Sequence, residues 1–445
     1  MLRAFADTFK IPDLRKKILV TLGIIAVFRL GSFITLPGID GASLALFFEK
    51  LTTQGGTLFS LMNLFAGGAM HRATIFALGI MPYISSSIIL QLLTVVVPSL
   101  EKLAKEGEMG RKKINQYTRY GTIILSVVQS FFIALWLERA DFGGLQIVQF
   151  PGWGFRLLTV ITLTAGSTFI MWLGEQIQEK GIGNGMSLLI TAGILSRGPT
   201  VLMQMGTMVQ SQQMDFIKII FMLALMVAAI MAVVMLTQGE RKIPVQYAKR
   251  VVGRKVLAGQ ATFIPFKVNH GGVMPIIFAQ SIILFPATMA VFMPNRFLQQ
   301  AANALSPGHI GYELLIMFLI IFFSYFYTAI AFNPVDVAEN MKKSGGFIPG
   351  VRPGSSTADY FDHIINRITL PGSIFLGIIA IAPDVIGRLL QIPYQVADFF
   401  GGTALLIVVG VSLDTMKQIE SQLLMRHYEG FMKRGRLKGR QRVAY

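Results

Sequence analysis

The sequence has no cysteine and few charged residues. Among its 445 residues, 14% are Asp, Glu, Lys or Arg, whereas a soluble domain has about 25%. The absence of cysteine excludes disulfides, Cys-ligated zinc, iron–sulfur clusters and a thiol nucleophile. With 53% hydrophobic residues, the composition excludes an ordinary soluble domain and favours a membrane protein.

The chain also lacks the patterns that carry most enzyme chemistry. It has neither a Gly-x4-Gly-Lys-Ser/Thr phosphate loop nor a Gly-x-Ser-x-Gly nucleophile turn. Its histidines are not spaced as metal ligands, and its apolar blocks lack the paired aspartates of an intramembrane protease. We therefore expect no enzyme, no metal site and no cofactor.

What the sequence does have is long apolar blocks. They lie near 18–37, 73–97, 120–137, 155–173, 185–196, 216–238, 272–294, 311–332, 369–387 and 400–413. A helix needs roughly 20 residues to cross a hydrocarbon layer of ~30 Å, so the short block 185–196 must extend into less apolar residues. The blocks predict an all-α integral membrane protein with ten transmembrane helices, and five spans followed by five permit two pseudo-symmetric halves. The first block is a full span without a cleavage site, so we expect no cleavable signal peptide.

The basic residues predict the orientation. With the N-terminus inside, 31 of the 40 Lys and Arg residues fall in the cytoplasmic segments, 8 fall on the opposite side and Arg29 lies within a span. Because basic residues resist translocation, this split places both termini in the cytoplasm. The net charge of +17 is thus largely a topology signal, although a basic loop also suits ribosomal RNA.

The spans and loops together suggest a domain organisation. We expect a cytoplasmic amphipathic segment at 1–17, an N-terminal half with spans 1–5 at 18–205, a C-terminal half with spans 6–10 at 206–423, and a basic cytoplasmic tail at 424–445.

Two long cytoplasmic loops, 239–271 and 333–368, stand out within the C-terminal half. Gly253 lies between two basic extended arms, which predicts a hairpin with its tip near 252–255. In the second loop, Gly and Pro residues hold Arg352 on an exposed turn. Such loops are either docking surfaces or solvated topology charge.

The polar residues inside the spans allow more than one interpretation. Arg29 is the one clear ionisable candidate; it either hydrogen-bonds to carbonyls of a neighbouring helix or binds a substrate. Serines and glutamines in the second, third and seventh spans either bond across helices or line a seam that can part. They are Ser85, Ser86, Ser87, Gln91, Gln129, Ser130, Gln280 and Ser281. The glycines of KGIGNGMS predict a tight loop with Asn184 as the cap of the fifth span.

Seven strings in the same order resemble the SecY family, the central channel subunits of the bacterial Sec translocase, over about 27–428. They are FALGIMPYISSSIILQLL, EGEMGRKKINQYTRYGT, MWLGEQIQEKGIGNGMSLLI, ERKIPVQYAKR, SIILFPAT, FYTAIAFNPVDVAENMKKSGGFIPGVRPG and FGGTALLIVVGVSLD. Departures are small: Met186 stands where isoleucine is frequent, Gly271 stands where alanine is usual, and 1–9 is idiosyncratic.

The resemblance implies a central pore with four groups of site residues. An aliphatic ring would comprise Ile80, Ile84, Met186, Ile190, Ile277 and Ile407. A re-entrant plug helix at about 57–72 would include Leu61, Asn63, Phe65, Gly67 and Gly68. A lateral gate between the second and third and the seventh and eighth spans would include Ser87, Gln91, Gln129, Gln280 and Ser281. Motor and ribosome docking would use Lys249, Arg250, Arg254, Lys255 and Arg352.

The resemblance also implies a function. The chain would conduct unfolded secretory proteins across the bacterial cytoplasmic membrane and release apolar segments laterally into lipid. Its partners would be SecE-like and SecG-like small membrane subunits, the SecA motor ATPase, the ribosome, and precursors with signal peptides. A secondary transporter for a small solute remains the alternative, with an intramembrane enzyme a distant third. A transporter would need ionisable groups near the bilayer midplane, where the spans offer Arg29.

Overall fold

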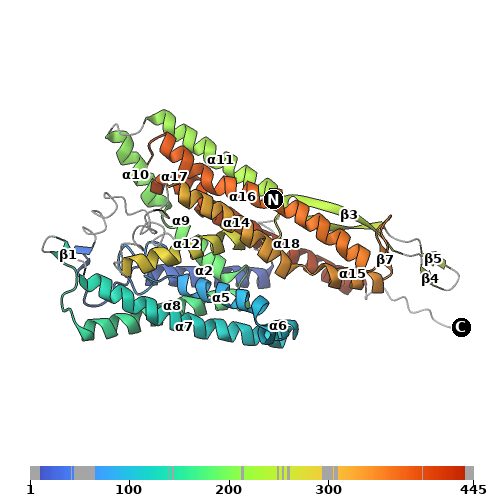
Figure 1. Cartoon of the computed structure of the whole chain (residues 1–445), viewed down its shortest axis with the longest axis horizontal. Helices are drawn as coiled ribbons and strands as arrows, with labels where there is room; N and C mark the ends of the chain where they lie inside the picture. The colour runs from blue at the N-terminus through green and yellow to red at the C-terminus, as the bar shows by residue number, and fades with distance from the viewer. Residues whose placement is uncertain are drawn as a thin grey trace. The chain divides into compact units, whose positions relative to one another are not determined.

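The computed structural model describes residues 11–41, 43–44, 66–139, 141–142, 145–211, 215–247, 250–252, 255–257, 261–292, 304, 309–392 and 394–435. Most of them are helical (Figure 1). The chain forms two compact units. Unit 1 comprises Met1–Gly56, Leu61–Arg197 and Val411–Tyr445, and unit 2 comprises Thr57–Ser60 and Gly198–Gly410. The predicted domain boundaries at residues 17, 205 and 423 stay predictions; α2 begins at Pro12 and passes residue 17 without a break.

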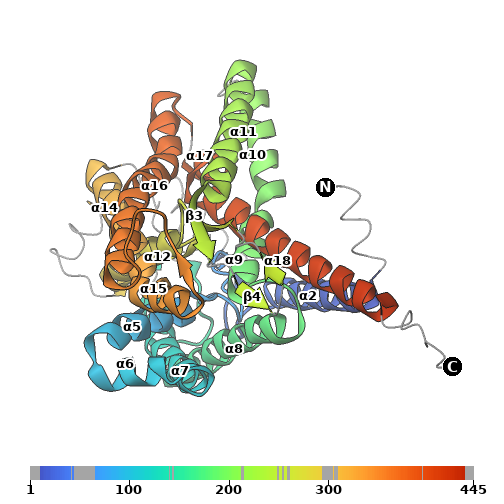
Figure 2. The same cartoon turned by 90° about the vertical axis from the view of Figure 1, so that its right-hand side faces the viewer.

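Unit 1 is built around two long helices that run side by side (Figures 1 and 2). Its elements are α2 (Pro12–Gly31), α5 (Met81–Val96), α6 (Pro98–Lys105), α7 (Glu108–Arg139), β1 (Asp141–Phe142), β2 (Leu145–Gln146), α8 (Trp153–Lys180), α9 (Gly185–Leu195) and the later part of α18 (Gly402–Gly435). Ion pairs join α7 to α8 near both ends, Arg119 with Glu175 and Glu138 with Arg156. The order of these pairs along the chain shows that the two helices are antiparallel, as two consecutive membrane spans must be.

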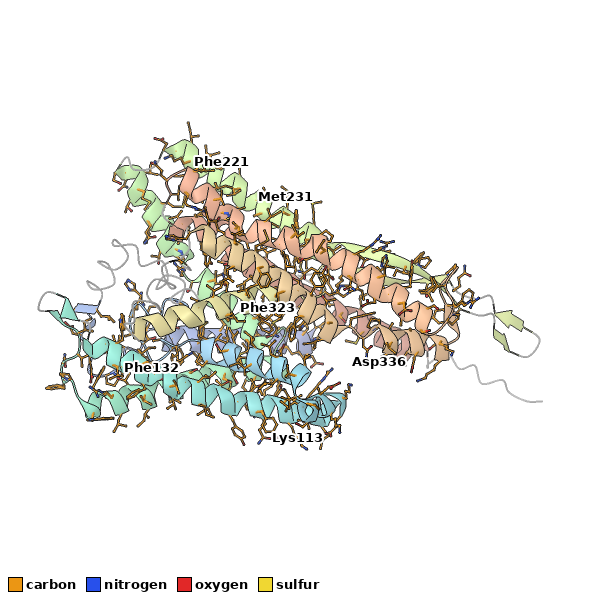
Figure 3. The ribbon with its side chains drawn as sticks, viewed as in Figure 1. Lys113, Phe132, Phe221, Met231, Phe323 and Asp336 are labelled. Carbon is orange, nitrogen blue, oxygen red and sulfur yellow. The ribbon has the colours of Figure 1, made fainter. Side chains whose placement is uncertain are left out.

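Unit 2 contains the other helices and most of the strands. Its elements are α10 (Gly198–Gln210), α11 (Phe216–Gln238), β3 (Glu240–Tyr247), β4 (Arg250–Val252), β5 (Lys255–Leu257), β6 (Ala261–Lys267), α12 (Met274–Phe292), α14 (Ile310–Ala331), α15 (Pro334–Lys343), β7 (Gly346–Phe347), α16 (Ser355–Leu389), α17 (Tyr394–Phe400) and the first turns of α18. Helices α14 and α16 pack together, and Phe323 of α14 is 1% exposed. Phe221 and Met231 project from α11 with 49% and 57% of their surface exposed (Figure 3).

Seven helices of the described residues are long and apolar enough to cross a membrane, or eight if the bent pair α5–α6 forms one span. One candidate covers Gly185–Gln210, so the fifth span extends beyond the short apolar block. The pair α5–α6 bends by 99° at Val97, because the following Pro98 disfavours a helical conformation in the residue before it. Helices α2 and α12 occupy the predicted first and seventh spans. The helical multi-pass membrane class is therefore confirmed, and the count of ten stays a prediction.

Candidate functional site

Two of the six predicted ring residues lie at the same level of unit 2. On one side of them, an added Cβ at Gly410 of α18 would collide with Val273, the residue directly before α12. On the other side, Gln280 of α12 donates a hydrogen bond to Thr403 of α18. Ile277 lies between Val273 and Gln280, and Ile407 lies between Thr403 and Gly410. The antiparallel register therefore places these two isoleucines level with one another, and both are buried, at 3% and 0% exposure.

The other four ring residues belong to unit 1. Ile80 caps the N-terminus of α5 and its carbonyl accepts from the Ile84 amide at 3.1 Å, so the two side chains share one helix face. Met186 and Ile190 are likewise one turn apart on α9, and all four residues are buried. The Met186 sulfur lies against Gly174 of α8, where any side chain at Gly174 would displace it.

The loop before α9 is held by side chains from two distant helices. Thr21 of α2 accepts from the Ile182 amide at 3.1 Å and donates to the Lys17 carbonyl at 3.0 Å. Gln418 of α18 accepts from the Gly183 amide at 2.9 Å. The Asn184 side chain accepts from the Ser187 amide at 3.3 Å, which confirms its predicted role as the cap. These bonds fix where α9 begins, and hence where Met186 and Ile190 lie.

Of the predicted plug, Leu61, Asn63 and Phe65 lie outside the described residues. Gly67 and Gly68 are described, with φ of +62° and +84°, a backbone conformation that favours glycine. The segment 66–80, which includes the last residues of the predicted plug, is tied to the turn after α2. The Leu36 amide donates to the Ala73 carbonyl at 2.9 Å, and the Ile75 amide donates to the Ile34 carbonyl at 2.9 Å.

Arg29 donates from Nη1 to the Gly67 carbonyl at 3.0 Å. The prediction that this side chain bonds to a carbonyl is confirmed. The predicted location of the acceptor on a neighbouring helix is wrong, because Gly67 lies in a turn of segment 66–80.

Two of the span serines bond across helices, as one of the two interpretations predicts. Ser86 of α5 donates to the Thr118 carbonyl of α7 at 2.9 Å, and Ser130 of α7 lies 3.5 Å from the Thr164 hydroxyl of α8. Of the five predicted gate residues, Gln280 also bonds across helices, to Thr403, and Ser87, Gln91 and Ser281 bond within their own helices. Gln91 donates to Ser87 on α5 at 3.0 Å, and Ser281 donates to the Ile277 carbonyl at 2.7 Å. Gln129 is half-buried on α7.

The two long loops of unit 2 form a single folded module. Strand β3 pairs with β6 and also with β7 of the second loop, in the order β6–β3–β7. Strands β4 and β5 pair Val252 with Lys255, which confirms the predicted hairpin tip. The β4–β5 ladder also continues the register of β3–β6, as the pairs Gln246 with Ala261 and Arg250 with Leu257 show.

This module, defined as β3, β6, β7, α15 and the first turns of α16, has its own hydrophobic core. Buried side chains alternate along β3, with Ile243 and Val245 turned inward. They pack with Phe266, Ala338, Met341, Ile348, Ala358, Phe361, Ile364 and Ile365. Helix α15 begins after Asn333, which accepts from the Val335 amide at 3.1 Å and precedes Pro334.

Arg352 lies at the edge of this module with its side chain exposed. Its carbonyl accepts from the Thr357 hydroxyl at 2.8 Å, and it is flanked by Gly350 and Gly354 at φ of +86° and +114°. The backbone around Arg352 is thus fixed while the guanidinium faces outward. Arg250 and Lys255 lie in β4 and β5, with side chains outside the described part, and Lys249 and Arg254 lie outside it altogether.

Within the described ranges, no three His, Asp or Glu side chains are placed to hold a metal ion. The residues that sequence reasoning missed are Thr21, Thr403 and Gln418, which position the ring helices. Their partners lie 161, 123 and 235 residues away, so no local pattern could reveal them.

The sequence profile of the SecY family matches residues 74–416. The protein translocase subunit SecY of Thermus thermophilus is 46% identical over 448 residues, covering 99% of this chain and 100% of that protein. The protein of the same name from Escherichia coli is 46% identical over 432 residues, 96% of each chain. The fold resembles the solved structure of a protein conducting channel, with a TM-score of 0.64, 16% identity and 92% of each chain covered. It also resembles Sec61 in the canine ribosome-channel complex, with a TM-score of 0.61, 17% identity and the same coverage.

Proposed function

The chain belongs to the SecY family, and from this premise we propose that it forms the protein-conducting channel of a bacterial translocase. Unfolded secretory proteins pass through an aliphatic constriction made by the six ring residues, and apolar segments leave sideways into lipid. The observation that carries this proposal is the level pairing of Ile277 and Ile407, bracketed by the Gly410 and Gln280 contacts. An aliphatic ring suits the task because it can yield to any sequence and dewets when empty.

The alternative of a solute transporter loses its main support in the described residues. A transporter needs an ionisable group that meets substrate near the midplane. Arg29, the candidate for that role, donates instead to a backbone carbonyl. The Glu313–Arg388 and Glu138–Arg156 ion pairs tie helices together near their predicted outer ends.

The docking surface is the module of unit 2 together with its hairpin. A folded module with its own core can hold Arg352 and the hairpin in fixed positions towards a partner, which two independent loops cannot. We propose that the SecA motor and the ribosome dock here, and that SecE-like and SecG-like subunits complete the complex. The resemblance to ribosome-bound channels supports this assignment. The basic split of 31 to 8 supports the bacterial cytoplasmic membrane orientation with both termini inside.

Ion conductance in planar bilayers tests the pore assignment. Replacing Ile84, Ile190 and Ile277 with serine makes the constriction wettable without changing any charge. Because the plug seals the same path, the triple variant alone leaks modestly, and it leaks strongly when 60–70 is also deleted. A well-expressed combined variant that stays as tight as the wild type would show that the pore does not pass through these residues.

A matched control separates the pore from ordinary core packing. Ile133 of α7, Leu189 of α9 and Ile276 of α12 are 4%, 0% and 1% exposed, and none of them lies four residues from a ring residue. Their replacement with serine creates similar cavities, which cost about 2–4 kcal/mol each by analogy with large-to-small core changes. If the six residues were only core, both triple variants would lose yield equally and neither would conduct ions.

A further inference from the structure

Arg29 lies within a predicted span, and the contacts of its guanidinium among the described residues include no carboxylate. Beyond its bond to the Gly67 carbonyl, its guanidinium carbon lies 5.6 Å from the centroid of the Phe33 ring. Arg72 lies over the same ring at 4.6 Å, so a second cation is close by and no compensating carboxylate is part of this contact. Burial of charge in a membrane is unfavourable, so the hydrogen bond to Gly67 offsets part of that cost, and Arg29 is a candidate for a functional role.

The accepting residue, Gly67, packs against α9, the helix that carries the predicted ring residues Met186 and Ile190. A Cβ built on Gly67 would lie 2.9 Å from the Gly193 Cα of α9. Two glycines therefore bring the 66–80 backbone directly onto α9, three residues after Ile190. The residues that follow Gly67 are buried, with Ala69 at 0% and Met70 at 5% exposure.

We propose that Arg29 is a positioning residue that holds the described end of the plug on α9, by anchoring the Gly67 carbonyl and so maintaining the Gly67–Gly193 contact. This inference rests on the assignment of 57–72 as the plug. Release of the plug then requires the Arg29 bond to break. Gly67 suits this attachment because its carbonyl accepts from Arg29, its positive φ favours glycine, and its missing side chain admits α9.

A competing explanation assigns Arg29 to α2 alone. It lies in the last turn of that helix, where a cation stabilises the helix dipole. That role involves only α2 and predicts no change around Met70 when Arg29 is replaced.

The test uses a single reporter cysteine in this cysteine-free chain. Met70→Cys is introduced into the full-length protein, purified with the subunits that accompany it, and its reaction rate with a water-soluble maleimide is measured. This readout does not depend on conduction, so the anchor and the proposed pore can fail separately. Arg29→Met removes the donors and should raise the labelling rate at least tenfold, the effect of losing one charge-assisted hydrogen bond. Arg29→Lys, which keeps a donor, should restore most of the protection.

A pair of glycine variants provides the matched control. Gly67→Ala and Gly68→Ala both place a side chain at positive φ, but only the first meets α9, since a Cβ built on Gly68 has no atom of the described residues within 4 Å beyond its own chain neighbours. Gly67→Ala should therefore expose the reporter more than Gly68→Ala does.

The double variant decides whether Arg29 acts through Gly67. If it does, Arg29→Met adds little to the labelling rate of Gly67→Ala, because the contact is already lost. Additive effects, or an unchanged rate in Arg29→Met, would overturn the proposal. If Arg29→Met does not accumulate, the same cycle is measured with Arg29→Lys. That substitution should raise the labelling rate partially when introduced alone and should not raise it further in the Gly67→Ala background.

Discussion

Replacing Thr21 with valine tests whether α2 fixes the start of the ring helix α9. The Thr21 hydroxyl accepts from the Ile182 amide at 3.1 Å, and Thr21 is 8% exposed. Valine keeps the β-branched shape and fills the same space, so packing changes little. It removes the hydroxyl that accepts from the buried Ile182 amide, which costs about 1–3 kcal/mol.

That free energy applies to local opening of the 181–184 loop. Because about 1.4 kcal/mol is a factor of ten, opening should become roughly 5 to 150 times more frequent. Hydrogen–deuterium exchange of peptides that cover Ile182 and Gly183 measures this directly, since amide exchange reports local opening. Exchange in α7, far along the chain and held by its own ion pairs to α8, should not change.

Three further variants test which side chains hold this loop. Thr21→Ser keeps the hydroxyl and should exchange like the wild type at Ile182. Gln418→Leu removes the acceptor of the Gly183 amide, whereas Gln418→Glu keeps one; this bond is exposed, so its loss should have a smaller effect. If Thr21→Val leaves exchange at Ile182 unchanged, the hydroxyl does not hold the loop and α9 is positioned by other contacts.

Three further predictions concern the module of unit 2, its hairpin and the residues beside it. Arg352→Glu should abolish motor-driven translocation, because an anion facing an acidic partner repels it, while the yield stays normal because an exposed loop substitution changes stability by under ~0.5 kcal/mol. Lys342→Glu on α15 is the control. Normal translocation by Arg352→Glu would show that Arg352 is not part of the docking site. Burial between Phe266 and Phe332, and then the nearby Lys267, lower the pKa of His270. The folded state therefore disfavours protonation of His270, and it should lose stability as pH falls below about 6.5. This loss should appear as faster hydrogen–deuterium exchange in β6, after correction for intrinsic exchange rates. His270→Phe should remove this pH dependence, and an equal loss of stability in that variant would assign the dependence to other groups. Cysteines introduced at Gly253 and Arg352 should label only from the cytoplasmic face, and labelling from outside would reverse the orientation.

Local sequence determined the features that depend on neighbouring residues. Apolar blocks gave the helices because a span needs about 20 consecutive apolar residues. Asn184 could be recognised as a cap and 252–255 as a hairpin tip because each depends on residues within a few positions. The motifs likewise indicated the family, since each string is a run of consecutive residues.

Contacts between distant segments decided the rest. The two loops that look separate in the sequence share one core, because β3 pairs with β7 about 100 residues further along the chain. The acceptor of Arg29 is Gly67 because of a backbone conformation that no spacing rule reveals. Ile277 and Ile407 lie level because Gly410 admits Val273 and Gln280 meets Thr403, contacts that exist only once α12 and α18 are packed. Sequence patterns report what each segment buries, whereas only the packed chain determines which segment it is buried against.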